Sequence, residues 1–240
     1  MRNILDRTPA RSMDDAVALM TAIDRRLPDD DGLKWFNRLY LNVTVSVREA
    51  AAQAAFADVP FLAELDIAFA NLYFAAIRAA ERADAAAAPS AWRPLLQARQ
   101  TPGLARLQFA LAGMNAHINR DLPEGIVQAF QKLGGDPISA EARRRDFDSV
   151  NAILERVEES VKAEFSVGVV GTIDRIGGQL DDVQAMWNVR AARHAAWTNA
   201  EVLWALDHVP LLRQRFFHRL DGLTGLASRG LLRPLVIATI

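Results

Sequence analysis

The chain has 240 residues, 51% of them hydrophobic and 24% charged, with a formal net charge of −1. This composition is enough for a substantial core, as one large domain or two small ones. Without an excess of positive charge, neither a nucleic acid nor a membrane is expected as a partner. The absence of cysteine excludes disulfides, thiolate nucleophiles and cysteine-ligated zinc or iron–sulfur sites.

The two ends of the chain differ in character. The start, MRNILDRTPARSMDD, is interrupted by charges and lacks the apolar core of a signal peptide. No apolar run approaches the roughly 20 residues that span a bilayer, so we expect a cytoplasmic protein. Residues 1–11 are predicted to form an N-terminal arm. Residues 229–240 are predicted to form an apolar tail that packs on the body or on a partner subunit, which would make a homo-oligomer.

Two helices are predicted in the first quarter of the chain. Ser12 and Asp15 indicate a capping box, in which each side chain accepts from the other's backbone N–H, before a helix to about Arg26. The acidic run 29–31 precedes a long helix to about Phe56. Its segment LYLNVTVSV also alternates with period two, as a strand would. Helix is favoured because both flanks are helical and no turn signal intervenes.

Further helices are predicted along the remaining chain, separated by short loops. We expect them at about 58–85, 102–121, 123–133, from 146 into the 160s, at 181–208 and at 210–228, with a break near Gly177. No βαβ alternation, fixed-period repeat or long polar linker is present. The prediction is therefore an all-α fold, with residues 1–240 in a single bundle of about eight or nine helices.

The clearest candidate for chemistry is His117 with Asp121, on the helix that ends NAHINRDLP. The two residues are four apart, so they project from one face. Gly113, one turn earlier, should leave open space beside the imidazole, and His117 is expected at the margin of the core. Such a pair can bind a metal ion or hold an imidazole in one tautomer for acid/base chemistry. The alternative is a structural pair in which Asp121 closes the helix end. Other polar groups nearby are Asn115, Asn119 and Arg120.

Asp66 is the second candidate, because it lies within an apolar stripe of its helix. The stripe contains Leu62, Phe69, Tyr73 and Ile77. A carboxylate in this position is costly unless it is paired or bound to a metal. It is therefore either a ligand or a buried acid satisfied by an arginine, a tyrosine hydroxyl or backbone donors.

The helix predicted at 181–208 carries the third candidate group. It has apolar residues on all sides, as a central helix does. One stripe of it contains Trp187, Arg190, His194, Trp197, Glu201 and Trp204. These residues suggest either an aromatic pocket with an anion anchor, a base and an acid, or an internal salt bridge among core aromatic rings.

Three stretches resemble an uncharacterised family of bacterial all-helical proteins, a domain of unknown function. They are FLAELDIAFANLY, QFALAGMNAHINRDLP and WNVRAARHAAWTNAEVLWAL, and the AGMNAHINRDLP signature is the most specific. The resemblance implies a helical fold and no particular activity. The H-x-x-x-D-x-P pattern of His117, Asp121 and Pro123 is also similar to a zinc-binding helix of the zinc-dependent phospholipase C and P1-type nucleases. Those enzymes hold three zinc ions with several histidines, whereas this chain has four histidines in all.

Three functions are compatible with these patterns. The first is an enzyme with a small-molecule pocket, in which His117, Asp121 and Asp66 bind one Zn, Mn or Fe ion that activates water, as in a hydrolase. In that hypothesis Arg120 or Arg190 neutralises a substrate anion and His194 or Glu201 acts as acid or base. The second is a metal-independent isomerase, lyase or cyclase of an apolar metabolite, with Asp66 as a carboxyl group of raised pKa. The third is a non-catalytic binding or scaffolding module.

Overall fold

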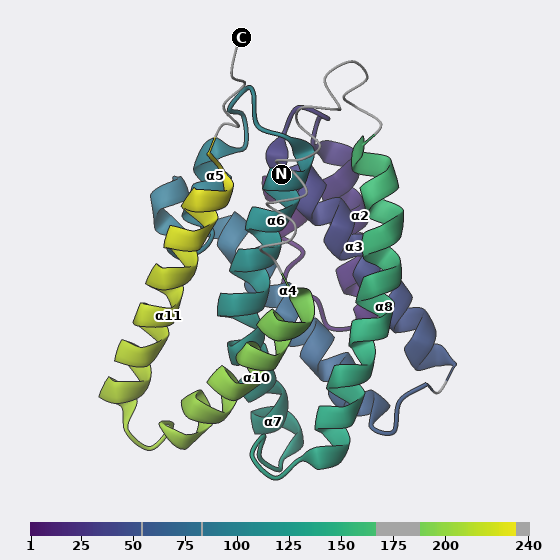
Figure 1. Cartoon of the computed structure of the whole chain (residues 1–240), viewed down its shortest axis with the longest axis vertical. Helices are drawn as coiled ribbons and strands as arrows, with labels where there is room; N and C mark the ends of the chain where they lie inside the picture. The colour runs from purple at the N-terminus through teal and green to yellow at the C-terminus, as the bar shows by residue number, and fades with distance from the viewer. Residues whose placement is uncertain (54, 83, 167–187, 234–240) are drawn as a thin grey trace.

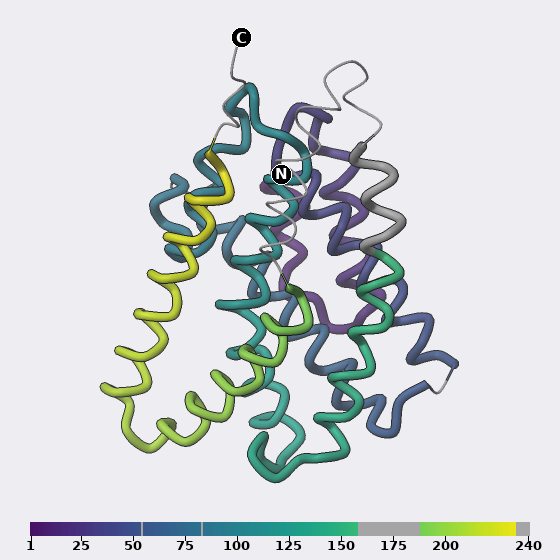
Figure 2. The backbone as a smooth tube through the Cα atoms, viewed as in Figure 1, coloured from purple at the N-terminus to yellow at the C-terminus, as the bar shows by residue number. Residues whose placement is uncertain are grey.

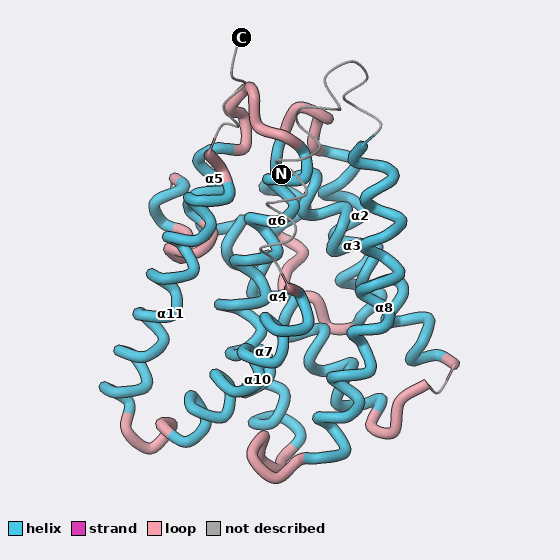
Figure 3. The backbone as a smooth tube through the Cα atoms, viewed as in Figure 1, coloured by secondary structure: helices cyan, strands magenta, loops and turns pink. Residues whose placement is uncertain are grey.

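The computed structural model describes residues 1–53, 55–82, 84–166 and 188–233, with residues 158–166 described by their backbone alone. Throughout these ranges the regular structure is helical and no strand occurs, which confirms the all-α prediction (Figure 3). The segment LYLNVTVSV is also helical, because packing against the neighbouring helices outweighs its local period-two pattern.

The first third of the chain forms four helices. They are α1 (Arg2–Leu5), α2 (Met13–Arg26), α3 (Gly32–Ala52) and α4 (Val59–Arg82). The Ser12 hydroxyl accepts from the Asp15 N–H at 3.0 Å, as predicted. The Asp15 carboxylate accepts from Arg11 N–H at 2.9 Å, not from Ser12, so the capping box closes one residue earlier than expected. The N-terminal arm is packed, because the Asn71 side chain exchanges two hydrogen bonds with the Ala10 backbone.

The described residues after Arg82 contain six α-helices and two short turns of other helical types. They are η1 (Ala85–Ala87), α5 (Arg93–Ala98), α6 (Arg106–Ala116), the π-helical turn η2 (His117–Asp121), α7 (Leu122–Leu133), α8 (Glu141–Ser166), α10 (Val189–Ala205) and α11 (Pro210–Leu231), within the described ranges. The predicted helix starts at 181–182 and the break near Gly177 lie outside the described residues.

Three boundaries differ from the sequence prediction. Pro102 lies in a turn with Gly103, whose φ is 83°, and helix begins only at Arg106. Pro123 does not end the preceding helix: Figure 2 shows α6 passing through η2 into α7 without a loop. Proline is compatible with this position because it directly follows the π-helical turn, where the regular α-helical hydrogen-bond pattern is already interrupted. α8 begins at Glu141 rather than at residue 146.

α6 lies at the centre of the molecule, with α11 along one outer edge and α8 along the other (Figure 1). Its flanking partners are α3 and α11, while α7 packs between α4 and α10. Every residue from Gln108 to Ile118 is buried, so this helix is enclosed by the rest of the bundle on all sides. α4 is long and apolar enough to cross a membrane by composition, but half of its most apolar stretch is buried against the other helices, as in the core helix of a globular bundle.

The start of the C-terminal tail packs on the body. The Gln108 side-chain amide donates to the carbonyls of Leu231 and Arg233 at 2.8 and 2.7 Å. Residues 234–240 lie outside the described residues, and association through them stays a prediction. α11 itself exposes four leucines on its outer surface: Leu211, Leu212, Leu223 and Leu226.

A substitution at Gly113 can test how closely α3 and α6 pack. A Cβ at this position would overlap the Phe36 ring. We therefore expect Gly113→Ala to lower the free energy of unfolding by about 1–3 kcal/mol, despite the better helix propensity of alanine. Gly222, in α11, is a matched control because a Cβ there meets no atom within 4 Å. Gly222→Ala should raise stability by about 0.5–1 kcal/mol. Urea unfolding measures both, and a Gly113→Ala protein as stable as the parent would contradict the close approach.

Candidate functional site

The sequence-predicted pair His117 and Asp121 bounds the π-helical turn between α6 and α7. Turns of this kind are rare and occur often at functional sites. Both side chains are buried, with 1% and 0% of their surface exposed. The prediction that His117 lies at the margin of the core is therefore wrong. The space expected beside Gly113 is not open either, because the Phe36 ring fills it.

The Asp121 carboxylate holds His117 in one tautomer. Its Oδ2 atom lies 3.0 Å from His117 Nδ1 and accepts a hydrogen bond from Trp92 Nε1 at 2.9 Å. Its Oδ1 atom accepts from Arg120 at 2.5 Å. An ionised carboxylate can only accept hydrogen bonds, so the His117 proton belongs on Nδ1 and the lone pair on Nε2. The imidazole is thus oriented as a base whose free atom is Nε2.

Five aromatic rings enclose the His117 imidazole. Phe69 stacks on it with a centroid distance of 3.4 Å and an interplanar angle of 5°, and Tyr40 meets it edge-on at 4.4 Å. Phe36, Trp92 and Tyr73 complete the enclosure at 5.6, 5.8 and 6.0 Å. Burial in this apolar shell lowers the pKa of His117, against the opposing effect of Asp121. The imidazole is therefore neutral near pH 7.

Four buried polar atoms around this shell have no hydrogen-bond partner. By strict hydrogen-bond geometry they are His117 Nε2, Tyr40 Oη, Thr44 Oγ1 and Asp66 Oδ2. The Thr44 hydroxyl is nevertheless close enough to Tyr40 to act on its phenol and to lower the pKa of that group, against the larger effect of burial. Leaving such an atom unpaired costs about 1–3 kcal/mol, so natural proteins keep few of them. Two more unpartnered atoms, Nε of Arg120 and of Arg213, belong to guanidinium groups whose other nitrogens are hydrogen-bonded to carboxylates.

The four atoms belong to one region. Tyr40 and Thr44 are one turn apart on α3, and Asp66 and Phe69 are one turn apart on α4. The Phe69 ring contacts both Tyr40, at 5.5 Å, and His117. The Asp66 charge is close enough to Tyr40 to help raise the pKa of that phenol, for which burial is the larger cause.

Asp66 is an acid with a perturbed pKa. Burial raises the pKa of this carboxyl group to about 7. The region therefore combines a neutral imidazole, a carboxyl group that exchanges its proton near neutral pH, and an un-ionised phenol. Titratable groups perturbed by desolvation in this way are frequent in active sites. We call His117, Asp66, Tyr40 and Thr44 the buried centre.

Asp66 does not join Asp121 in a shared ligand set. Asp121 is committed to Trp92, Arg120 and His117, and the described residues contain no group of three or more His, Asp or Glu side chains placed to hold one ion. A metal bound by His117 would have to use Nε2, with Asp66 as a second ligand. Metal binding at these residues stays a prediction.

Three polar residues beside His117 have structural partners. Arg120 pairs with Asp121 and, at 3.6 Å, with Asp221, so its charge is neutralised within the fold. Asn115 donates to the Thr224 carbonyl and the Ser228 hydroxyl of α11, and Asn119 donates to Asn115. These amides tie α11 to the centre of the bundle. None of these hydrogen bonds involves a residue of the buried centre.

The stripe on α10 makes its polar contacts elsewhere. Arg190 is exposed and pairs with Glu155 of α8. His194 is exposed and contacts Arg144 of α8 at 2.7 Å.

The α10 tryptophans belong to the hydrophobic packing. Trp197 is buried among the rings of Phe61, Phe130 and Phe147, and its indole N–H donates to Glu201. Trp204 packs on Phe130. Core aromatic rings are therefore present as predicted, but the expected internal salt bridge is not formed, because Arg190 pairs with Glu155 at the surface and Glu201 accepts from Trp197. Trp187 lies outside the described residues.

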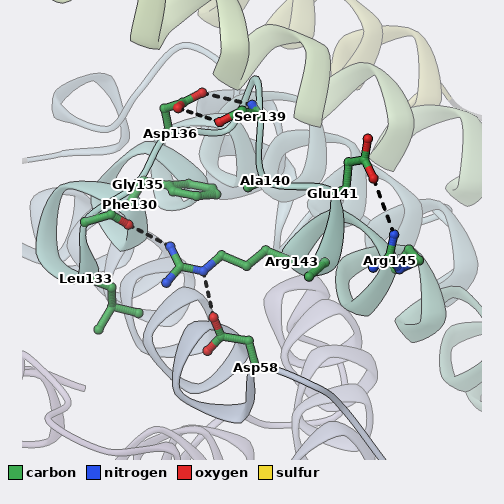
Figure 4. Close-up of a pocket in the computed structure, with 12 residues that line it drawn as sticks. Asp58, Phe130, Leu133, Gly135, Asp136, Ser139, Ala140, Glu141, Arg143 and Arg145 are labelled. Atoms are coloured by element: carbon green, nitrogen blue, oxygen red, sulfur yellow. Dashed lines mark hydrogen bonds and ion pairs between the residues drawn. The ribbon is translucent and has the colours of Figure 1, made fainter.

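A surface hollow of about 700 Å³ lies at the turn between α7 and α8 (Figure 4). Its polar groups are already engaged. Arg143 donates to Asp58 and to the Gly134 carbonyl, both at 2.7 Å, and Asp136 accepts from Ser139. The hollow is therefore a concave surface on which Arg143 and Asp136 already have hydrogen-bond partners, in contrast to the side chains of the buried centre.

Sequence reasoning identified His117, Asp121 and Asp66 and missed Tyr40, Thr44 and Trp92 as their neighbours. It placed Phe69 beside Asp66 but not beside His117. A hint for Tyr40 and Thr44 was present, since two polar side chains four apart on an apolar helix share one face. Trp92 had no local signal, because it reaches Asp121 from a segment 29 residues away.

A family model matches residues 13–234, and its description is a family of unknown function, DUF5995. No curated protein and no solved structure gives a match. The likeness to the zinc phospholipases and P1-type nucleases is tested by none of these comparisons.

Asp66→Asn tests whether the buried carboxyl group is unpaired. A folded-state pKa of about 7, above the unfolded value of 3.8, means that folding favours the protonated acid. That stability is present below pH 3.8 and is lost as the pH rises toward 7. At pH 8 the penalty is at most on the order of 4 kcal/mol, and partial solvent access reduces it, so we expect Asp66→Asn to gain about 1–3 kcal/mol.

The measurement is urea unfolding at several values between pH 4 and pH 8. The variant should show a flatter pH dependence than the parent. Asp14→Asn, at an exposed carboxylate paired with Arg48, is the control and should leave the profile unchanged. A variant that is less stable than the parent at pH 8 would show that Asp66 is satisfied by partners in solution.

Proposed function

We propose that this chain, which belongs to DUF5995, a family of unknown function, is an enzyme that transfers protons to or from a small, mainly apolar molecule at the buried centre. No known activity of the family guides this assignment. One observation carries the proposal. A histidine with a fixed tautomer has its free nitrogen buried near Tyr40, in a region that also holds an unpartnered Asp66 oxygen and the neighbouring hydroxyl groups of Tyr40 and Thr44.

Each member of the buried centre has a role that follows from its surroundings. His117 is the base, because its Nδ1 proton is held by Asp121 and its Nε2 lone pair is free. Asp66 supplies the acid, because its raised pKa keeps part of it protonated at neutral pH. The hydroxyl groups of Tyr40 and Thr44 can donate hydrogen bonds to an oxygen of the substrate. The surrounding rings accept its apolar part.

The chemistry of the centre narrows the reaction class. Arg120, the cation nearest in sequence to His117, is paired with two carboxylates, so it is not available to a substrate anion. No cysteine nucleophile exists in the chain. An acid and a base without a free cation suit an isomerase, lyase or cyclase that moves a proton on a neutral molecule. This is the second of the functions considered from the sequence, now with Tyr40 and Thr44 added.

The test follows proton transfer directly. Small neutral metabolites that raise the melting temperature are incubated with the protein in D2O, and exchange of carbon-bound hydrogen is followed by NMR. His117→Gln should slow exchange by about 10²–10⁴-fold, the usual effect of losing a general base. Asp66→Asn should also slow it, in a protein that stays folded. Asn119→Ala is the control, since Asn119 bonds only to Asn115 among these groups. Hydrogen exchange at the parent rate in both His117→Gln and Asp66→Asn would overturn the proposal.

A mononuclear metal site is the second candidate function, with one observation in its favour. A histidine whose Nδ1–H is held by a carboxylate while Nε2 stays free is the arrangement that metal-binding histidines adopt. His117 Nε2 and Asp66 would then be ligands, with Asp121 orienting the imidazole. Imidazole with carboxylate suits Zn, Mn or Fe. The ion would polarise a substrate oxygen or activate water, as in a hydrolase.

Metal content separates the two candidates. If the metal site exists, protein purified without chelator should contain about one ion per chain, and His117→Gln and Asp66→Asn should each lose it. Glu201→Gln, on α10, is the control and should retain it. If proton transfer needs no metal, exchange in D2O should persist after chelation. Trace metal only, with no change of melting temperature on adding Zn²⁺, Mn²⁺ or Fe²⁺, would eliminate the metal site.

A further inference from the structure

Phe69 differs from the other rings around His117 in its access to solvent. Phe36, Tyr73 and Trp92 are each 0% exposed and Tyr40 is 3% exposed, whereas Phe69 is only partly buried. Asp66, one turn earlier on α4, is also partly buried. Of the five rings, Phe69 is therefore the one between the imidazole and the outside of the molecule.

The stack of Phe69 on His117 is close to complete overlap. A centroid distance of 3.4 Å at an interplanar angle of 5° leaves almost no lateral offset. Two neutral rings prefer an offset or edge-on arrangement, and burial lowers the His117 pKa so that this imidazole is neutral. The contact is thus weaker than the area of the two rings suggests, and outward rotation of Phe69 loses little.

The backbone beneath Phe69 is held in place. Gly125 of α7 packs against this backbone, because a Cβ there would lie in ordinary van der Waals contact with the Phe69 Cα and Cβ atoms, at 3.6 Å. α4 and α7 are packed along their length. Any opening at this point is therefore a rotation of the Phe69 side chain and needs no movement of α4.

We propose that Phe69 is the gate of the buried centre and that its ring occupies the place of the substrate's planar group. The inference rests on the function proposed above. Outward rotation leaves a slot one ring thick, with the imidazole on its face and Tyr40 at its edge. A slot of this shape accepts a flat, unsaturated ring and excludes a puckered one.

The charges around the slot select an uncharged ligand. Asp121 holds the imidazole, the charge of Asp66 acts on Tyr40 at the edge of the slot, and the Arg120 guanidinium is paired with Asp121 and Asp221. An anion would meet carboxylate without a free cation to balance it. The substrate class is therefore a small, planar, neutral ring that carries a group able to exchange a proton with His117 or Asp66.

The first experiment measures access to His117 by diethyl pyrocarbonate, with modification at each histidine followed by mass spectrometry. His194, His208 and His218 are exposed and serve as internal references. Phe69→Ala should speed modification of His117 relative to them by at least ~10-fold, because the gate no longer limits the open population. Phe61→Ala, which removes a buried ring near Trp197, is the matched control and should leave the ratio unchanged.

The second experiment measures ligand selection in the same variant. Phenol should bind Phe69→Ala at least ~10-fold more tightly than the parent, because the slot is vacant, and it should protect His117 from modification. Cyclohexanol and benzoate, which test planarity and charge, should each bind more weakly than phenol and protect less. Phe69→Leu keeps apolar volume without a flat ring, and it replaces Phe69→Ala if that protein does not fold.

The outcomes distinguish the gate from the proposed function. Unchanged His117 modification in both Phe69 variants, or equal protection by cyclohexanol and phenol, overturns the gate. Faster modification with phenol protection, together with parent-rate proton exchange in His117→Gln, supports the gate and removes proton transfer at His117. Loss of exchange in His117→Gln with unchanged modification in the Phe69 variants supports proton transfer and removes the gate.

Discussion

The carboxylate of Asp121 is the constraint on which the rest of the structure depends. An ionised group with no exposed surface is strongly destabilising unless donors surround it. Asp121 receives three, from its own turn through His117 and Arg120 and from the segment before α5 through Trp92. Arg120 extends the pairing to Asp221 of α11, which itself accepts from the Ser90 and Ala91 N–H groups. One buried charge thus connects η2, the start of α5 and α11.

This connection also decides how His117 is presented. With Nδ1 held by Asp121, the free nitrogen is directed away from the satisfied carboxylate. The second buried acid, Asp66, lies on another helix and retains an oxygen without a partner. The two carboxyl groups therefore differ in their hydrogen bonds. Both oxygens of Asp121 accept from donors, whereas one oxygen of Asp66 has no donor. Environments that differ in this way separate acid and base roles among chemically similar residues.

The other candidate polar groups in the described part of the chain have partners within the fold. Those of the α10 stripe bind α8 or brace Trp197, and those of the hollow between α7 and α8 are engaged locally. Unmet hydrogen-bonding capacity in the described side chains is concentrated around His117 instead. Because an apolar core of this kind favours complete pairing, this exception is the feature on which the proposed function is based.

The sequence by itself determined the helical fold, most helix positions and the three residues of greatest chemical interest. Periodicity places apolar residues on faces, and a carboxylate within such a face is visible without coordinates, as Asp66 was. The four-residue spacing also placed His117 beside Asp121. Only the tertiary structure decided that Asp121 is satisfied by Trp92, that Phe36 fills the space beside Gly113, and that Tyr40, Thr44 and Phe69 surround the imidazole. The reason is physical: spacing fixes which residues share a helix face, whereas the partner across that face comes from distant segments whose packing no local pattern records.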